Sequence, residues 1–146
     1  MTSEKAEYLR NWLFRANEDI AVINNLAANN LEYYTSTICF HSQQAVEKFL
    51  KAFLIFHDID FPKTDDLDFL LLECKKIDMV SFEIDLKSLT DFGVSIRYPD
   101  DFYIPGIKET QEYIKIAEEV NTSLKKELNF ESQSHDVTKL NDNPES

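Results

Sequence analysis

The segment FHSQQAVEKFLKAFLIF, residues 40–56, decides the fold of this 146-residue chain. From Val46 to Phe56 it is apolar on several sides of a helix, and it contains neither glycine nor proline. A helix of this kind lies in the middle of a bundle, because several of its sides need an apolar partner. We therefore predict a central helix from about Glu32 to His57, ended before Pro62, whose ring cannot continue a helix.

Apolar residues recur at three- and four-residue steps on both sides of this segment, which is the period of a helix with one buried face. Before it, the pattern runs from Tyr8 to Leu26. After it, Ser81 can cap a helix that ends at Tyr98-Pro99, because the residue before proline avoids helical geometry. The sequence thus predicts an all-α, up-and-down bundle of four to five helices, at about residues 3–30, 32–57, 66–76, 81–98 and 107–128.

Composition indicates one domain followed by a tail. The chain has only two Gly and four Pro, fewer turn residues than sheet proteins or loop-rich folds use. Its length is that of one ordinary domain. Residues 131–146 are polar and show no periodicity, which is typical of a flexible chain end. We expect one helical domain over residues 1–130 and a flexible tail over residues 131–146.

Charge and hydropathy limit the partners. The formal net charge is −12, so the chain repels polyanions on average; this argues against DNA and against non-specific RNA binding. The apolar run Phe49–Phe56 is interrupted by Lys51 and is too short to cross a bilayer. Cys39 and Cys74 form no CxxC pair, so we expect them to be reduced and buried. These features favour a cytoplasmic protein with no membrane partner.

The residues that usually hold metals or phosphates are scattered along the chain. His41, His57 and His135 form no HxxxH or ExxH pair, so we expect no metal site. A Gly-rich phosphate loop cannot be built from Gly93 and Gly106 alone. We therefore expect no cofactor.

One face of the central helix is polar. At about 100° per residue, five polar side chains share an arc of about 80°: Thr37, His41, Gln44, Lys48 and Lys51. One interpretation is a solvated face with an i,i+4 pair between Glu47 and Lys51. The other is the wall of a polar groove or a subunit interface.

The same helix carries a family signature. The run QQAVEKFLKA, residues 43–52, resembles the QQAxEKxLKA signature of HEPN domains (higher eukaryotes and prokaryotes nucleotide-binding). Three further pieces agree in order and spacing between about residues 8 and 128: an opening helix with Trp12, Leu13, Ala16, Asp19 and Ile20, the stretch KTDDL at residues 63–67, and an RYP element at residues 97–99 followed by Asp100.

This resemblance implies a bundle of four to five helices that is usually a homodimer. Stand-alone prokaryotic (bacterial) members are often encoded beside a small nucleotidyltransferase and pair with it, and some are toxins that cleave RNA. In those ribonucleases an Arg is followed four to six residues later by a His, and the two act across the dimer. The resemblance therefore makes Arg97 a candidate catalytic residue.

The chain departs from this pattern after Arg97. No His follows between residues 98 and 104, and Asp65 stands where the family often has another His. Metal-free RNA cleavage needs a group that moves a proton near neutral pH, and His is the usual one. Tyr103 has the required spacing, but a phenol with an ordinary pKa near 10 is a poor base. The catalytic dyad is therefore incomplete.

Two interpretations of Arg97 stay open. It can cap a helix C-terminus and pair with Asp100 or Asp101. It can also bind a phosphate or carboxylate with its planar guanidinium. In the second case we expect Arg97, Lys48, Lys51 and His41 to line one groove, with Gln44 and Asp100 as further ligand-binding candidates. Independently of Arg97, the loop aromatics Tyr98, Phe102 and Tyr103 can stack on a base or, as the acidic charge favours, fill a dimer interface.

Three functions follow from these residues. The first is a dimeric, non-catalytic binding module that works with a partner such as a nucleotidyltransferase, in a toxin–antitoxin-like or regulatory system. The second is a metal-independent RNA-cleaving toxin that uses Arg97 with a non-standard partner such as Tyr103 or His41. The third is a sensor of a nucleotide or another anion, built on Lys48, Lys51 and Arg97.

Overall fold

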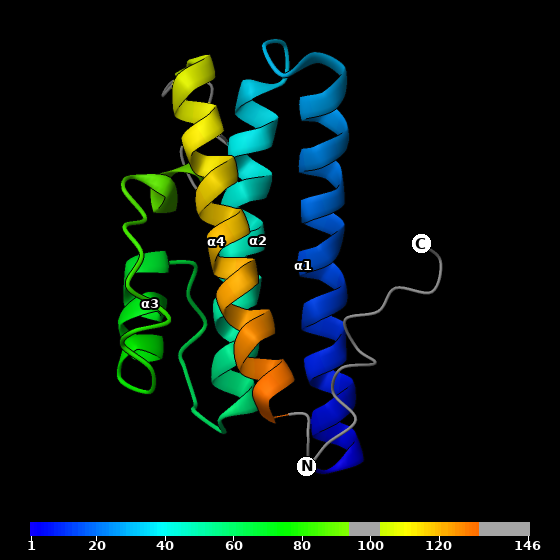
Figure 1. Ribbon diagram of the computed structural model, residues 1–146, viewed down its shortest axis with the longest axis vertical. Helices are drawn as coiled ribbons and strands as arrows, with labels where there is room; N and C mark the ends of the chain where they lie inside the picture. The colour runs from blue at the N-terminus through cyan, green and yellow to red at the C-terminus, as the bar shows by residue number, and fades with distance from the viewer. Residues whose placement is uncertain (94–102, 132–146) are drawn as a thin grey trace.

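The computed structural model describes residues 1–93 and 103–131, and all regular structure in these ranges is helical. Three long helices form the bundle: α1 (Ser3–Asn30), α2 (Thr35–Phe56) and α4 (Ile107–Glu131). A short helix, α3 (Leu67–Lys75), and a 3₁₀ helix, η1 (Leu89–Gly93), lie beside them. The predicted all-α bundle is therefore confirmed, and Figure 1 shows that α1 runs opposite to α2 whereas α4 runs in the same direction as α2.

The helix α2 is the centre of the fold, as its sequence predicts. It packs against α1, α4, α3 and η1. Its later half buries Phe49, Leu50, Phe53 and Leu54 completely or nearly so. Removing such side chains from water stabilises the fold by roughly 1.5–3 kcal/mol each. The bundle core is therefore built around the segment that carries the family signature.

The hairpin of α1 and α2 is fixed at its open end by one lysine. The side chain of Thr2 accepts a hydrogen bond from the backbone of Lys5 and thereby caps α1. The ammonium of Lys5 donates to the carbonyl of Phe56, 3.0 Å away, and pairs with the carboxylate of Asp58 at 2.6 Å. The start of α1 thus satisfies a carbonyl at the end of α2 and sets how the two helices align.

The predicted fourth helix is wrong over residues 81–88. These residues form turns and irregular backbone, and only η1 is helical. The carboxylate of Asp78 accepts from the backbone of Ser81, and that of Asp85 accepts from Lys87, whose φ is 53°. Such side-chain bonds to the backbone compete with a helix, and Lys87 adopts a left-handed conformation that a helix excludes. Residues 94–98 of the predicted helix lie outside the described residues.

The irregular segment is nevertheless well packed. Phe82 and Leu86 are buried, and the hydroxyl of Ser123 on α4 donates to the carbonyl of Ser81 at 2.8 Å. Phe82 and Leu86, although spaced as in a helix, therefore pack a non-helical segment against the bundle. The predicted tail from residue 132 onward is outside the described residues. No described helix is long and apolar enough to cross a membrane.

Candidate functional site

The polar face of α2 meets a buried carboxylate from α1. The side chain of Asp19 is 8% exposed. One of its oxygens lies 2.8 Å from Nδ1 of His41, and the other lies 2.6 Å from Nζ of Lys48. Both oxygens of the carboxylate therefore have a partner, which is what a buried charge requires. The two predicted ligand-binding residues His41 and Lys48 are thus brought together by Asp19.

Lys51 lies one turn further along α2 in a different environment. Its ammonium is 2.8 Å from the carboxylate of Glu47, and its side chain is 9% exposed. The same ammonium lies 5.3 Å from the ring centre of Trp12 and 5.7 Å from that of Phe61. An aromatic face attracts a cation, so the rings and Glu47 together compensate this charge. The predicted i,i+4 pair is present, but Lys51 itself is buried.

Gln44 belongs to a second set of contacts, through its neighbour Gln43. The amide of Gln44 donates to the side-chain oxygen of Gln43 at 2.7 Å, and Gln43 donates to the carbonyl of Asp65 at 3.4 Å. A Cβ at Gly93 would lie 2.8 Å from Nε2 of Gln43, so only glycine permits this approach. Gln43 therefore ties α2 to the loop before α3 and to the last residue of η1.

Tyr103 stands just before α4 with an exposed ring. Its hydroxyl donates a hydrogen bond to the carboxylate of Glu109 at 2.7 Å. This hydrogen bond and the nearby charge of Glu109 raise the pKa of Tyr103 above its usual value. A phenol that is harder to ionise is a weaker candidate base at neutral pH. The predicted residues Arg97 and Asp100 lie outside the described residues, as do Tyr98 and Phe102.

The other histidines lie apart from this cluster. The ring of His57 contacts Phe53 and Phe56 at the end of α2. His135 is outside the described residues. Over residues 1–93 and 103–131, no group of three or more His, Cys, Asp and Glu side chains is placed to hold a metal ion.

The arrangement can bind an anion only in competition with its own carboxylates. His41 and Lys48 already face Asp19, and Lys51 already faces Glu47. A phosphate would have to displace either Asp19, which α1 holds against α2, or Glu47, which pairs with Lys51 within α2. The cluster is thus better suited to fixing two helices than to receiving a polyanion.

Asp19 is a residue of this cluster that the sequence does not single out as a site residue. It belongs to the opening motif of the family resemblance, and the motif does not indicate its partners His41 and Lys48. The available signal was an acid at a helical step from Ala16 and Ile23, both of which are buried. A carboxylate in an apolar stripe needs a cation from the neighbouring helix, and Lys48 on the polar face of α2 supplies one.

Comparison with known proteins places these motifs in a family. The model of the HEPN domain matches residues 9–128, which include every described helix except the first residues of α1 and the last of α4. Comparison with curated proteins and with solved structures gives no match. The matched span contains the QQAVEKFLKA run and the RYP element, and it covers most of the chain. The chain belongs to the HEPN domain family.

Proposed function

We propose that this chain is a HEPN binding module that acts as a homodimer with a partner protein and lacks the Arg/His ribonuclease dyad. The partner class that the family resemblance favours is a small nucleotidyltransferase, in a toxin–antitoxin-like or regulatory system. In this proposal the chain contributes surfaces for assembly and does not cleave RNA.

The observation that carries the proposal is the hydrogen bond from the hydroxyl of Tyr103 to the carboxylate of Glu109. In the family's ribonucleases a His follows the Arg by four to six residues, and here Tyr103 stands at that spacing from Arg97. The hydroxyl of Tyr103 is engaged with Glu109, which raises its pKa. Arg97 is therefore followed by a group that holds its proton at neutral pH.

Exposed apolar side chains beside Tyr103 support the homodimer. The side chains of Tyr103, Ile104 and Ile107 are 59%, 61% and 43% exposed at the start of α4. Exposed aromatic and aliphatic residues that adjoin one another are typical of protein interfaces. Tyr103 can contribute its exposed ring to such an interface while its hydroxyl keeps its proton.

Purified protein tests this function directly. The full chain, with EDTA present, should leave a panel of structured and single-stranded RNAs intact, and Arg97→Ala should behave identically. The informative variant is Tyr103→His, which supplies the missing base at the family spacing, with Tyr103→Phe as its control. Cleavage of RNA by the unaltered chain that Arg97→Ala abolishes would refute the proposal. Cleavage gained only in Tyr103→His supports it.

The homodimer has its own measurement. Analytical ultracentrifugation of the full chain should report a dimer, and the double variant Ile104→Glu, Ile107→Glu should report a monomer. Burying two carboxylates in an apolar interface costs more than such an interface provides. Tyr8→Glu, on another exposed apolar side chain, is the matched control and should leave the dimer intact. A monomeric unaltered chain would refute this part of the proposal.

One observation favours a second candidate, the metal-independent ribonuclease. Nδ1 of His41 faces the carboxylate of Asp19, and a carboxylate of this kind orients an imidazole for proton transfer. If cleavage is found, His41→Ala and Asp19→Asn should both reduce it. Tyr103→Phe should leave it unchanged.

A further inference from the structure

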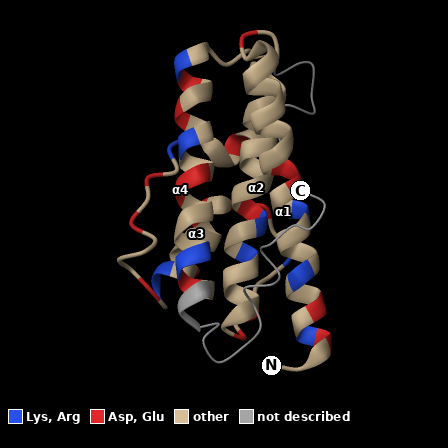
Figure 2. Cartoon of the chain, turned by 45° about the vertical axis from the view of Figure 1, so that its right-hand side comes forward, with Lys and Arg blue, Asp and Glu red and all other residues tan. Residues whose placement is uncertain are grey.

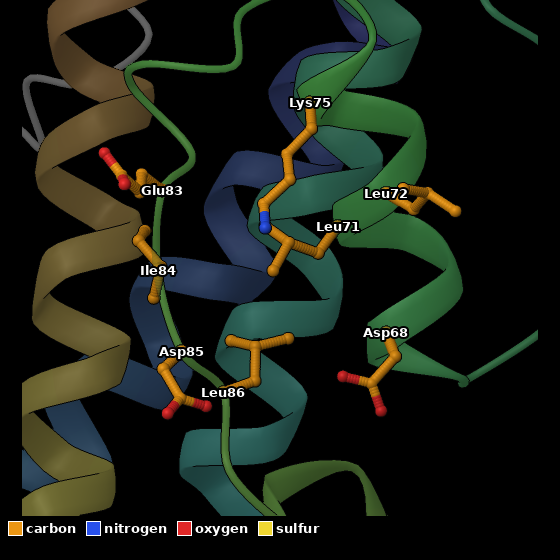
Figure 3. Close-up of a pocket in the computed structure, with 8 residues that line it drawn as sticks. All are labelled: Asp68, Leu71, Leu72, Lys75, Glu83, Ile84, Asp85 and Leu86. Atoms are coloured by element: carbon orange, nitrogen blue, oxygen red, sulfur yellow. The ribbon is translucent and has the colours of Figure 1, made fainter.

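An open groove of about 580 Å³ runs between α3 and the irregular segment at residues 83–86. Leu71 and Leu86 form its floor and are almost fully buried. Figure 3 shows both leucines directed inward between α3 and the segment, whereas the side chains of Glu83 and Asp85 stand at its edge. The groove therefore has an apolar floor and a charged rim.

The rim is acidic. Asp68, Glu83 and Asp85 are exposed carboxylates, and Lys75 is the one cation among the residues that line the groove. Burial first, and then the charges of Asp66, Asp91 and Asp85, raise the pKa of Asp68. In Figure 2 acidic positions recur along the segment that links α3 to η1.

Apolar side chains are exposed on α3 and on the turns that follow it, and one of them, Leu72, lines the groove. Of the twelve large apolar side chains that are exposed among the described residues, five lie between residues 69 and 80: Phe69, Leu72, Ile77, Met79 and Val80. Val80 is 83% exposed. A short stretch with this much exposed apolar surface is typical of a site of protein contact.

We propose that the groove between α3 and residues 83–86 docks a partner segment that carries lysine or arginine beside leucine-like side chains. The floor takes the apolar side chains, and the carboxylates of Asp68, Glu83 and Asp85 take the cations. This surface is separate from the α1–α2 cluster and from the start of α4. The assignment rests on the proposed function in one respect, namely that the chain acts by binding another protein.

Lys75 places a positive charge of the chain itself in the groove. In Figure 3 its ammonium extends between α3 and the segment at residues 83–86. Among the described residues it makes no ion pair or hydrogen bond. The groove thus already contains one cation of the chain itself, which an incoming lysine or arginine must approach against repulsion. Removal of this charge should therefore strengthen binding, while removal of the carboxylates should weaken it.

The experiment is a titration of the full chain with a fluorescent peptide of lysines and leucines, in which the leucines recur at helical i, i+3, i+4 and i+7 positions. The triple variant Asp68→Asn, Glu83→Gln, Asp85→Asn keeps the shapes and the acceptor oxygen for Lys87. It should weaken binding about tenfold, as three exposed charge pairs imply. Lys75→Gln should strengthen binding about twofold to fivefold.

Two controls separate docking from general attraction to an acidic protein. The triple variant Glu112→Gln, Glu118→Gln, Glu119→Gln changes the net charge equally on exposed positions of α4 outside the groove. It should bind the peptide as the unaltered chain does. A peptide of the same composition with its leucines scattered should bind more weakly.

The proposal is overturned if the two triple variants weaken peptide binding equally. It is also overturned if Lys75→Gln does not bind the peptide more tightly than the unaltered chain. Self-association of the chain that the groove variants abolish would also overturn it, because the occupant would then be a second copy. The ribonuclease assay decides the proposed function independently. If the chain cleaves no RNA and does not bind the peptide, only the groove proposal is refuted and the proposed function stands.

Discussion

Two charged regions of this molecule differ in what surrounds their carboxylates. On the polar face of α2, Asp19 and Glu47 are nearly buried and each is bound to a cation of the same chain. In the groove beside α3, Asp68, Glu83 and Asp85 are exposed, and the nearby Lys75 pairs with none of them. A buried charge that is paired within the fold destabilises the fold when its partner is removed, whereas a charge left in solvent is available to a binding partner. The first region therefore holds the helices together, and the second offers a binding surface.

The largest effect should come from Asp19→Ala. The change leaves Lys48 and His41 facing each other across a partly buried site without their shared carboxylate. Breaking a buried ion pair costs about 3–5 kcal/mol, and the partial exposure of both partners reduces this to about 2–3 kcal/mol. Urea denaturation followed by circular dichroism measures it. The groove triple variant is the matched control, and an equally large loss there would remove the distinction between the regions.

Glu47→Gln should have an intermediate effect. The amide keeps one oxygen for the ammonium of Lys51 but removes the negative charge, so that only Trp12 and Phe61 compensate the cation. We expect a loss of about 1–2 kcal/mol in the free energy of unfolding. Glu118→Gln, on the exposed side of α4, should change the same quantity by less than about 0.5 kcal/mol. Similar values for both variants would show that Lys51 does not depend on Glu47.

The long helices could be predicted from the sequence because each has a buried stripe maintained over many turns. The segment at residues 81–88 could not, since Phe82 and Leu86 satisfy a helical step while packing from irregular backbone. What distinguishes the two cases is local: Asp85 bonds to the backbone of Lys87. The apolar pattern alone does not report such bonds.

In the candidate site, too, some features could be predicted from helical periodicity and others could not. The polar arc of α2 followed from helical periodicity, because residues on one helix share a known geometry. Its partner Asp19 depended on the register between α1 and α2, which is set by tertiary packing. Neither Lys51 under Trp12 nor Gln43 against Gly93 could be foreseen, since each contact joins residues more than thirty positions apart.

Gly93→Ala tests a further contact of α2, the close approach of Gln43 to Gly93 in η1. The new Cβ would lie 2.8 Å from Nε2 of Gln43, which is fully buried and bonded to Asp65. The side chain of Gln43 must move and lose this bond, so we expect a loss of about 1 kcal/mol in stability. In the background of Gln43→Ala the same change should cost much less, because the collision is gone. Additive effects would mean that the two residues do not contact each other.

The smallest effect, and the only favourable one, should come from Asp68→Asn. The pKa of Asp68 is raised by burial first and then by the neighbouring carboxylates, so the charged form is less stable in the folded state than in the unfolded state. This penalty is present at neutral pH and disappears as the pH falls through the raised pKa, where the carboxyl takes up a proton. Asp68→Asn should therefore be slightly more stable than the unaltered chain at pH 7, and the difference should vanish in acid. Urea denaturation of both proteins at a series of pH values measures this difference. A constant difference across the series would mean that the pKa of Asp68 is not raised in the folded state.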